Sequence, residues 1–242
     1  MRNYLVMAVG LAVGLSACNT QEAVTESQQL PLKPQLALAD VVPAMQPGTP
    51  EAKAAQEAFL QENVFRFRSR EMAGAYYVLQ AQRAFKEEKL DSAAFFFNSA
   101  YLMDSTNNNV YWGYGLVYGQ QQQYDEALFI LYHALEKDAQ NPRLLNDIAT
   151  SHLNRFYLTS NPEDLLQSRK LLEQAVQLSP EEADLYYKLA INSYYLREYE
   201  DAWDYLHKSM RRNQQIADKA FISALTEKQQ DPQGQNAPQL GQ

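Results

Sequence analysis

The sequence predicts an all-α protein of stacked antiparallel helix pairs, with one further helix before the pairs and one after them. No proline occurs from residue 51 to residue 141, and apolar side chains recur there at spacings of three and four residues. This pattern is typical of long amphipathic helices. A self-comparison of the chain brings four similar units into register, each of 34 residues except the third. Repetition at such a period predicts a solenoid of stacked helix pairs.

The four units are expected at residues 74–107, 108–141, 142–182 and 183–216. Two antiparallel helices approach closely only where side chains are small, so three equivalent positions of each unit should hold Gly, Ala or Ser. All twelve do: Ala81, Ala93, Ala100, Gly115, Ala127, Ala134, Ala149, Ser168, Ala175, Ala190, Ala202 and Ser209. We expect the helices of each pair to pack closely at these positions.

The second and fourth units resemble the tetratricopeptide repeat (TPR). The second unit carries Tyr111, Gly115, Tyr118, Tyr124 to Ala127, Leu131 and Ala134. The fourth repeats this pattern with Tyr186, Leu189, Ala190, Tyr199 to Ala202, Leu206 and Ser209. The resemblance implies a right-handed superhelical solenoid, in which the first helices of the pairs line a concave groove.

The third unit is seven residues longer than the others. Its second helix is expected to start at Asn161, because asparagine is a favoured N-cap and Pro162 suits the first helical position. We expect residues 153–160 to lengthen the connection between the two helices. Such an insertion is either a functional surface or a tolerated extension.

Helical and unstructured segments are predicted on both sides of the repeats. Residues 51–73 should form an N-terminal helical segment, which Thr49 and Pro50 begin and which carries Ala55, Ala58 and Phe59 inward. A capping helix at 217–229 should cover the last unit, as terminal helices of repeat arrays do. The Gln-rich residues 230–242 are expected to be a disordered tail.

Residues 1–17 are predicted to be a lipoprotein signal peptide. An apolar run of about 12 residues follows Arg2 and is too short to span a membrane, which takes about 20. It ends in Leu-Ser-Ala-Cys at 15–18, which resembles the bacterial lipobox. The resemblance implies cleavage before Cys18, the chain's single cysteine, and a covalent lipid on its sulfur. An ordinary secretory signal with an incidental cysteine is the alternative.

Residues 18–50 are expected to be a lipidated, disordered tether. Five prolines with many Gln and Thr give a composition that builds no core. Asn19 follows the cysteine where an aspartate would resemble an inner-membrane retention signal. The resemblance therefore implies attachment to the outer membrane, facing the periplasm.

The composition and motifs argue against nucleic-acid binding and against catalysis. A net charge of −8 supplies no general field for phosphates. The glycines from Gly113 to Gly119 fall inside a predicted helix and follow no strand, so they suit helix packing and not a phosphate-binding loop. His133, His152 and His207 form no ligand pair, and the paired acids sit at helix starts or turns. We expect no catalytic residue, no metal and no cofactor other than the lipid.

Binding in the concave groove is the function that these observations favour. The family resemblance implies inward-facing positions that include Val78, Gln82, Trp112, Leu116, Asn146, Thr150, Tyr187 and Ile191. Their apolar wall and amide–hydroxyl pair suit a peptide with apolar anchors. For each of these residues, packing between repeats is the alternative role. The lysine and asparagine clamp of the chaperone-binding members is disfavoured, because Val78 and Trp112 occupy clamp positions.

The sequence thus predicts a membrane-anchored scaffold that binds a partner protein, as part of an envelope assembly, secretion or cell-wall complex. A self-associating subunit, with Phe95 to Phe97 or the insertion as contact, is an alternative. An auxiliary module of an envelope enzyme is a weaker one. The basic and aromatic segment from Phe65 to Arg70 is either a helix end with solvated arginines or a contact to a membrane or an anionic partner.

Overall fold

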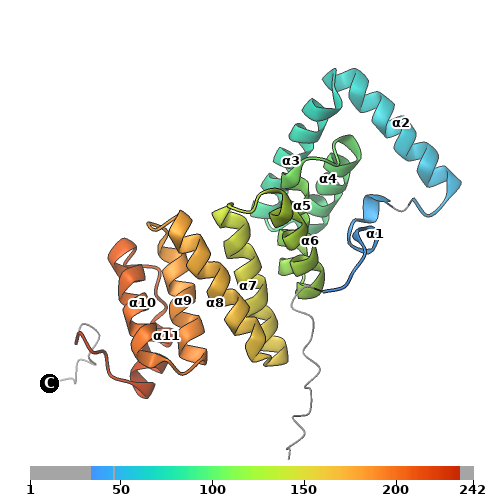
Figure 1. The fold of residues 1–242 in the computed structure, drawn as a ribbon. Helices are drawn as coiled ribbons and strands as arrows, with labels where there is room; N and C mark the ends of the chain where they lie inside the picture. Colours follow the sequence, from blue (N-terminus) through green and yellow to red (C-terminus); the bar gives the residue numbers. More distant parts are fainter. Residues whose placement is uncertain (1–33, 46, 235–242) are drawn as a thin grey trace, which may run out of the picture.

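Four antiparallel helix pairs follow one another along the chain in the computed structural model, which describes residues 34–45 and 47–234 (Figure 1). Regular structure within these residues is entirely helical. The pairs are α3 (Arg70–Lys86) with α4 (Leu90–Met103), α5 (Asn108–Gln120) with α6 (Tyr124–Lys137), α7 (Pro142–Thr159) with α8 (Pro162–Leu178), and α9 (Ala183–Tyr195) with α10 (Tyr199–Arg212). The prediction of an all-α solenoid of helix pairs is confirmed.

The small residues lie where the helices of each pair meet. All twelve predicted positions are buried. Gly115 has no room for a side chain, because a Cβ there would approach the side chain of Leu131 to 2.4 Å. Gly113 has still less space, because a Cβ would meet the Phe97 ring of the preceding unit at 2.0 Å. These glycines serve helix packing, as predicted.

The predicted capping helix is α11 (Lys219–Lys228), which lies against the last pair. Leu225 is fully buried and packs in one cluster with Ala202, Trp203 and Leu206 of α10. Beyond α11, the expected disorder is wrong for the first residues of the tail. The Gln229 carbonyl accepts a hydrogen bond from the Trp203 indole at 2.9 Å, and Asp231 pairs with buried His207 at 3.1 Å. Residues 235–242 lie outside the described part.

The additional residues of the third unit lengthen its helices and not, as expected, their connection. Helix α7 has 18 residues where α5 and α9 have 13, and α8 has 17 where α6 and α10 have 14. Only residues 160 and 161 separate α7 from α8. Asn161 caps α8 as predicted, since its side chain accepts from the Glu163 amide. The insertion therefore extends the pair beyond its neighbours at this edge of the array.

Part of the expected tether is ordered. Residues 34–45 contain the short helix α1 (Leu38–Val41) and the 3-10 turn η1 (Pro43–Met45), which contact α6 and α4. Val41 and Val42 are fully buried, and the Val41 carbonyl accepts a hydrogen bond from the Tyr118 hydroxyl at 2.6 Å. Burial of this apolar stretch outweighs the prolines on which the prediction of disorder depended. Residues 1–33, with the predicted signal and Cys18, lie outside the described part.

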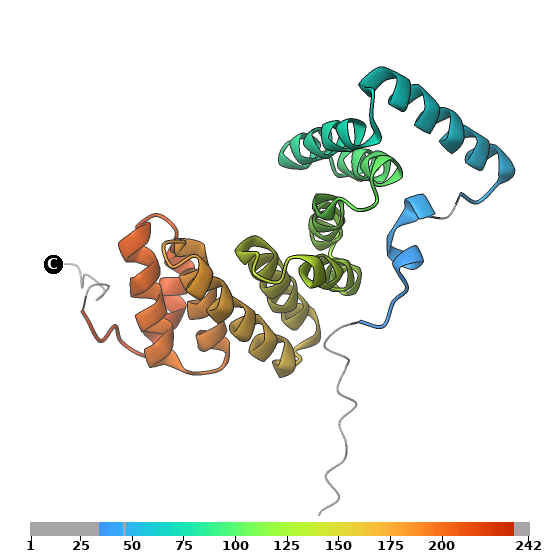
Figure 2. The ribbon, with the colours of Figure 1, turned by 45° about the horizontal axis from the view of Figure 1, so that its top comes forward.

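Helix α2 (Pro50–Phe67) projects from the end of the array opposite α11 (Figure 2). Thr49 caps it as predicted, but Ala55 and Ala58 are exposed and only Phe59 is half-buried. The buried residue is instead Asn63, whose side-chain oxygen accepts from the Tyr77 hydroxyl at 2.7 Å. Ser69 caps α3, so the first repeat helix begins four residues before the predicted start at residue 74. Among the described helices, none has the length and apolar character of a membrane span.

Candidate functional site: the inner groove

The first helices of the pairs form the inner side of the array. Helix α3 contacts α5, α5 contacts α7, and α7 contacts α9. In a curved stack, the elements on the concave side lie closest together, so these helices line the groove. The predicted groove residues all belong to them.

Trp112 occupies the centre of the groove and is fixed by a hydrogen bond to the next unit. Its indole Nε1–H donates to Oδ2 of Asp147 at 2.7 Å, which joins α5 to α7. Burial raises the pKa of Asp147, and the bond from Trp112 opposes this rise. The half-buried ring lines a pocket of about 350 Å³. The other lining residues are Gln82, Phe85, Lys86, Phe97, Asn109, Leu116 and Arg143.

A second pocket, also of about 350 Å³, adjoins the first between α5 and α7. The two pockets share Phe85 and Leu116 in their walls. Gly119 contributes no side chain, and a Cβ there would meet nothing within 4 Å. Three predicted residues, Gln82, Trp112 and Leu116, thus lie together where the two pockets adjoin.

The predicted amide–hydroxyl pair has its polar groups bonded within the protein. The Asn146 amide donates to Asp184 at 3.3 Å, and its oxygen accepts from the Lys188 ammonium at 3.0 Å. The Thr150 hydroxyl donates to the backbone carbonyl of Asn146 at 2.8 Å. Asn146 lines a separate pocket of about 380 Å³, and Thr150 lines the second of the two adjoining pockets.

Val78 and Tyr187 do not take the places expected for them. Val78 is 6% exposed and belongs to the core, so it offers no groove surface. Tyr187 packs edge-on against Phe221 of α11 with ring centroids 5.6 Å apart, and its hydroxyl accepts from the Asp218 amide. The terminal helix therefore covers part of the apolar wall expected in the fourth unit, where Ile191 is half-buried.

Two groove residues escaped the sequence prediction. Lys86 lies at the end of α3, one residue after the inward-facing Phe85, and lines the Trp112 pocket. Asp147 was not distinguished from other acids, because its role depends on Trp112 in the preceding unit. The position of Lys86 next to an inward-facing residue could have predicted its place in the groove. The bond between Trp112 and Asp147 could not be predicted in this way, because it depends on how two successive units stack in the superhelix.

A buried polar network lies away from the groove, between α6, α7 and α8. His152 is fully buried; its Nδ1 lies 2.6 Å from Oδ1 of Asp164 and its Nε2 lies 2.9 Å from the Tyr132 hydroxyl. A carboxylate only accepts, so Nδ1 carries the hydrogen and the neutral ring accepts from Tyr132. Burial raises the pKa of Tyr132 to about 12, which keeps its hydroxyl protonated. His152 is therefore satisfied by protein partners.

Arg155 completes this network. Its guanidinium contacts Asp164 through Nε at 3.0 Å and Nη2 at 2.7 Å, and it reaches Asp125 of the second unit at 2.6 Å. Burial raises the pKa of Asp164, but the bonds from His152 and Arg155 outweigh burial and hold this pKa below its ordinary value. The network thus braces the lengthened pair against its neighbour. In the described residues, no three His, Cys, Asp or Glu side chains are grouped to hold a metal ion.

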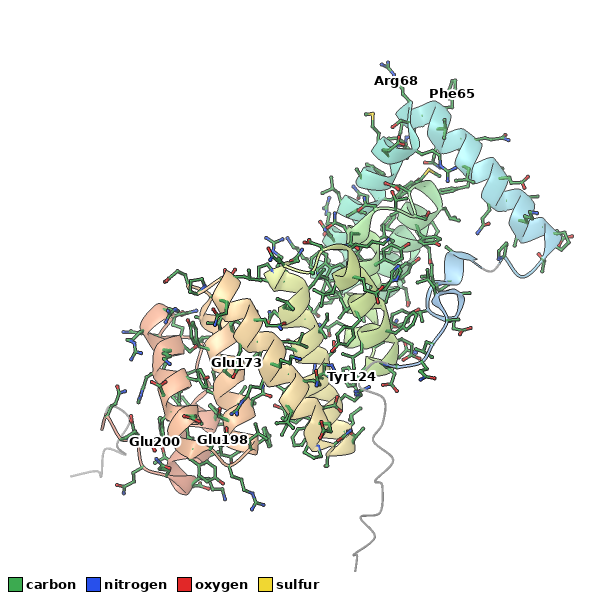
Figure 3. All side chains as sticks on the ribbon, in the orientation of Figure 1. Phe65, Arg68, Tyr124, Glu173, Glu198 and Glu200 are labelled. Atoms are coloured by element: carbon green, nitrogen blue, oxygen red, sulfur yellow. The ribbon has the colours of Figure 1, made fainter. Side chains whose placement is uncertain are left out.

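The basic and aromatic segment lies at the junction of α2 and α3, where Phe65 and Arg68 are labelled at the projecting end (Figure 3). Phe65 is 90% exposed. Arg66 lies over the rings of Phe67 and Tyr76. Arg66, Arg68 and Arg70 are all exposed where α2 ends and α3 begins, as expected for solvated arginines at a helix end, and Arg70 also donates to two carbonyls at the end of α4. The Arg70 guanidinium therefore interacts favourably with the C-terminal end of α4.

The contact expected for self-association is largely internal. Phe97 is fully buried and Phe96 is half-buried, so only Phe95, at 61% exposed, presents a large surface. At the end of the lengthened α7, Tyr157 is 47% and Leu158 is 64% exposed.

Solved structures with the same architecture identify the fold. A TPR protein of Thermus thermophilus matches with 14% identity and a TM-score of 0.55, over 64% of this chain and 81% of that one. MamA of Desulfovibrio magneticus matches with 16% identity and a TM-score of 0.52, over 74% and 94%. BtubC of P. vanneervenii matches with 16% identity and a TM-score of 0.54, over 75% and 84%.

The chain has a TPR fold. No family model and no curated protein matches the sequence, so these structures establish the architecture alone. Within this TPR array, the pockets around Trp112 and Leu116 form the candidate site.

Proposed function

We propose that the chain is a protein-binding scaffold of the bacterial cell envelope. Cys18 carries the lipid that anchors it to a membrane, and the inner groove holds a segment of a partner protein. The observation that carries the binding proposal is the Trp112 indole, fixed by Asp147 beside two adjoining pockets of about 350 Å³ each. Pockets of this volume accept apolar side chains of a ligand, and a preordered tryptophan loses little entropy on binding.

Binding explains the groove better than catalysis does. Within the groove, hydrogen bonds to other groups of the protein engage the side chains of Asn146, Thr150 and Asp147. A catalytic site would need a nucleophile or base directed at a substrate. The surface that remains is largely apolar, with amides and the cations Lys86 and Arg143 at its edge, which suits a peptide with apolar anchors and a few polar contacts.

Replacement of Trp112 tests the binding proposal. Crosslinking in native cells, followed by mass spectrometry, should identify partner proteins with the wild-type chain and lose them with Trp112→Ala. Phe95→Ala is the matched control, since Phe95 is an exposed aromatic side chain on the second helix α4. Full retention of every partner by a folded Trp112→Ala protein would remove the groove from the proposal.

The anchor has a separate test. Cells grown with an alkyne-labelled fatty acid should label the wild-type chain but not Cys18→Ser, and the labelled chain should fractionate with the outer membrane. Absence of label on the wild-type chain would refute lipidation. Label in the inner-membrane fraction would refute the location and leave the anchor.

A further inference from the structure

Two cations, and no carboxylate, line the Trp112 pocket of about 350 Å³, whereas a smaller pocket of about 190 Å³ that shares Trp112 and Arg143 also contains Asp138. Lys86, the last residue of α3, and Arg143, in the first turn of α7, belong to the wall from two different units. The remaining lining side chains are apolar or carry amides. This local positive charge contrasts with the net charge of −8 for the chain.

Two of the acids near the groove are paired with other cations: Glu87 with Arg83 and Lys89, and Asp184 with Lys188. Asp147 accepts from Trp112, lines the adjoining pocket and interacts electrostatically with Arg143. Among the described residues, no carboxylate lies within ion-pair distance of Lys86 or Arg143, and both side chains are exposed. The two cations thus line the pocket without a direct ion pair, and Asp147 is a nearby acid that acts on Arg143 at longer range.

We propose that the groove selects an acidic partner segment, in which an apolar side chain enters the Trp112 pocket and a neighbouring Asp or Glu lies between Lys86 and Arg143. The inference rests on the proposed function, because it names the class of segment that the same groove binds. Opposite charges at the rim of an apolar pocket set specificity and association rate more than total affinity. A lysine or arginine in the same place would meet two like charges, so the groove rejects basic segments.

Peptide selection tests this proposal on the full chain. Immobilised wild-type protein is screened against random 12-residue peptides displayed on phage, and affinities for wild type and variants are measured from the fluorescence anisotropy of dye-labelled copies of the selected peptides. We expect selected peptides to be enriched in Asp or Glu beside an aromatic or aliphatic residue. Replacement of that acid by Lys should weaken binding by about tenfold, with a smaller difference at high salt.

Charge reversal provides the sharper arm. Lys86→Glu with Arg143→Glu should select peptides with Lys or Arg in place of the acid. The matched control is Lys170→Glu with Arg211→Glu, which makes the same change in net charge at exposed positions on α8 and α10 and should select as the wild type does. If the reversed protein does not fold, Lys86→Gln with Arg143→Gln should abolish the acid preference.

The outcomes separate the two proposals. Peptides that depend on Trp112 but show no acid enrichment, or that keep it after charge reversal, would overturn the acidic preference and leave groove binding intact. Peptides that bind Trp112→Ala as well as wild type, or no selection of any peptide, would overturn both.

Discussion

Arg155 and Asp164 join the two added parts of the third helix pair: Nη2 of Arg155 donates to Oδ1 of Asp164 at 2.7 Å, with both side chains buried. Arg155 begins the extra residues of α7, and Asp164 lies in the extra first turn of α8. The insertion therefore brings its own internal brace, which makes the pair a rigid extension of the array.

Removal of Asp164 should strongly destabilise the protein. Asp164→Ala leaves the Arg155 charge and the His152 Nδ1–H without their partner, and breaking a buried ion pair in this way costs about 3–5 kcal/mol. Urea unfolding of the two proteins measures the difference. Asp184→Ala is the control, because its ion pair with Lys188 is partly exposed and contributes less than about 1 kcal/mol. Equal effects for the two variants would contradict a bracing role.

The same network predicts a loss of stability in mild acid. Burial lowers the pKa of His152, against the opposing effect of Asp164. The folded state thus favours the neutral ring, and the free energy of unfolding should fall as the pH drops below about 6.5, the ordinary value for histidine. It should continue to fall until the pH passes the folded-state pKa. His152→Gln should flatten this dependence, which urea unfolding at a series of pH values measures.

Two glycines of α5 should respond in opposite ways to alanine. At Gly113 a Cβ would lie 2.0 Å from the Phe97 ring, so Gly113→Ala should cost about 1–3 kcal/mol through overpacking. At Gly119 a Cβ meets nothing within 4 Å, so Gly119→Ala should be neutral or stabilise by up to about 1 kcal/mol. Thermal unfolding compares them. If both substitutions destabilise the protein, the space around each Cβ does not decide the effect, and this explanation is contradicted.

The docked segment 34–45 should detach when its buried valines become charged. Val41→Asp with Val42→Asp places two carboxylates in an apolar site, which is costly without partners. Hydrogen exchange at residues 37–45 should then approach the rate of an unstructured chain, while α5 and α6 stay protected. Unchanged protection of 37–45 would contradict the docking.

The repeat pattern predicted the fold because close helix packing requires small residues at fixed spacing, as at Ala81, Gly115 and Ala190. The same logic failed where the decisive contact lies far away in the chain. Helix α1, which carries Val41, packs against α6, and Asp231 pairs with His207. The composition of these two segments predicted neither contact, so both segments were expected to be disordered.

The groove was predicted in the same uneven way. The repeat positions that the TPR resemblance implies placed Gln82, Trp112 and Leu116 correctly on the inner helices. It did not show that Asn146 would be bonded to Asp184 and Lys188, because these partners belong to the next unit. Contacts between units depend on the superhelix, which a single repeat does not specify.

Site-specific photocrosslinking in cells tests the central claim, that the inner groove holds a partner protein, most directly. A photoreactive phenylalanine analogue replaces Leu116 in the groove or, as the control, Leu166, which is 45% exposed on the second helix α8. We predict that the probe at position 116 crosslinks a distinct partner, that Trp112→Ala abolishes this crosslink, and that position 166 gives none. Crosslinks to that partner from position 166 and not from position 116 would contradict the account.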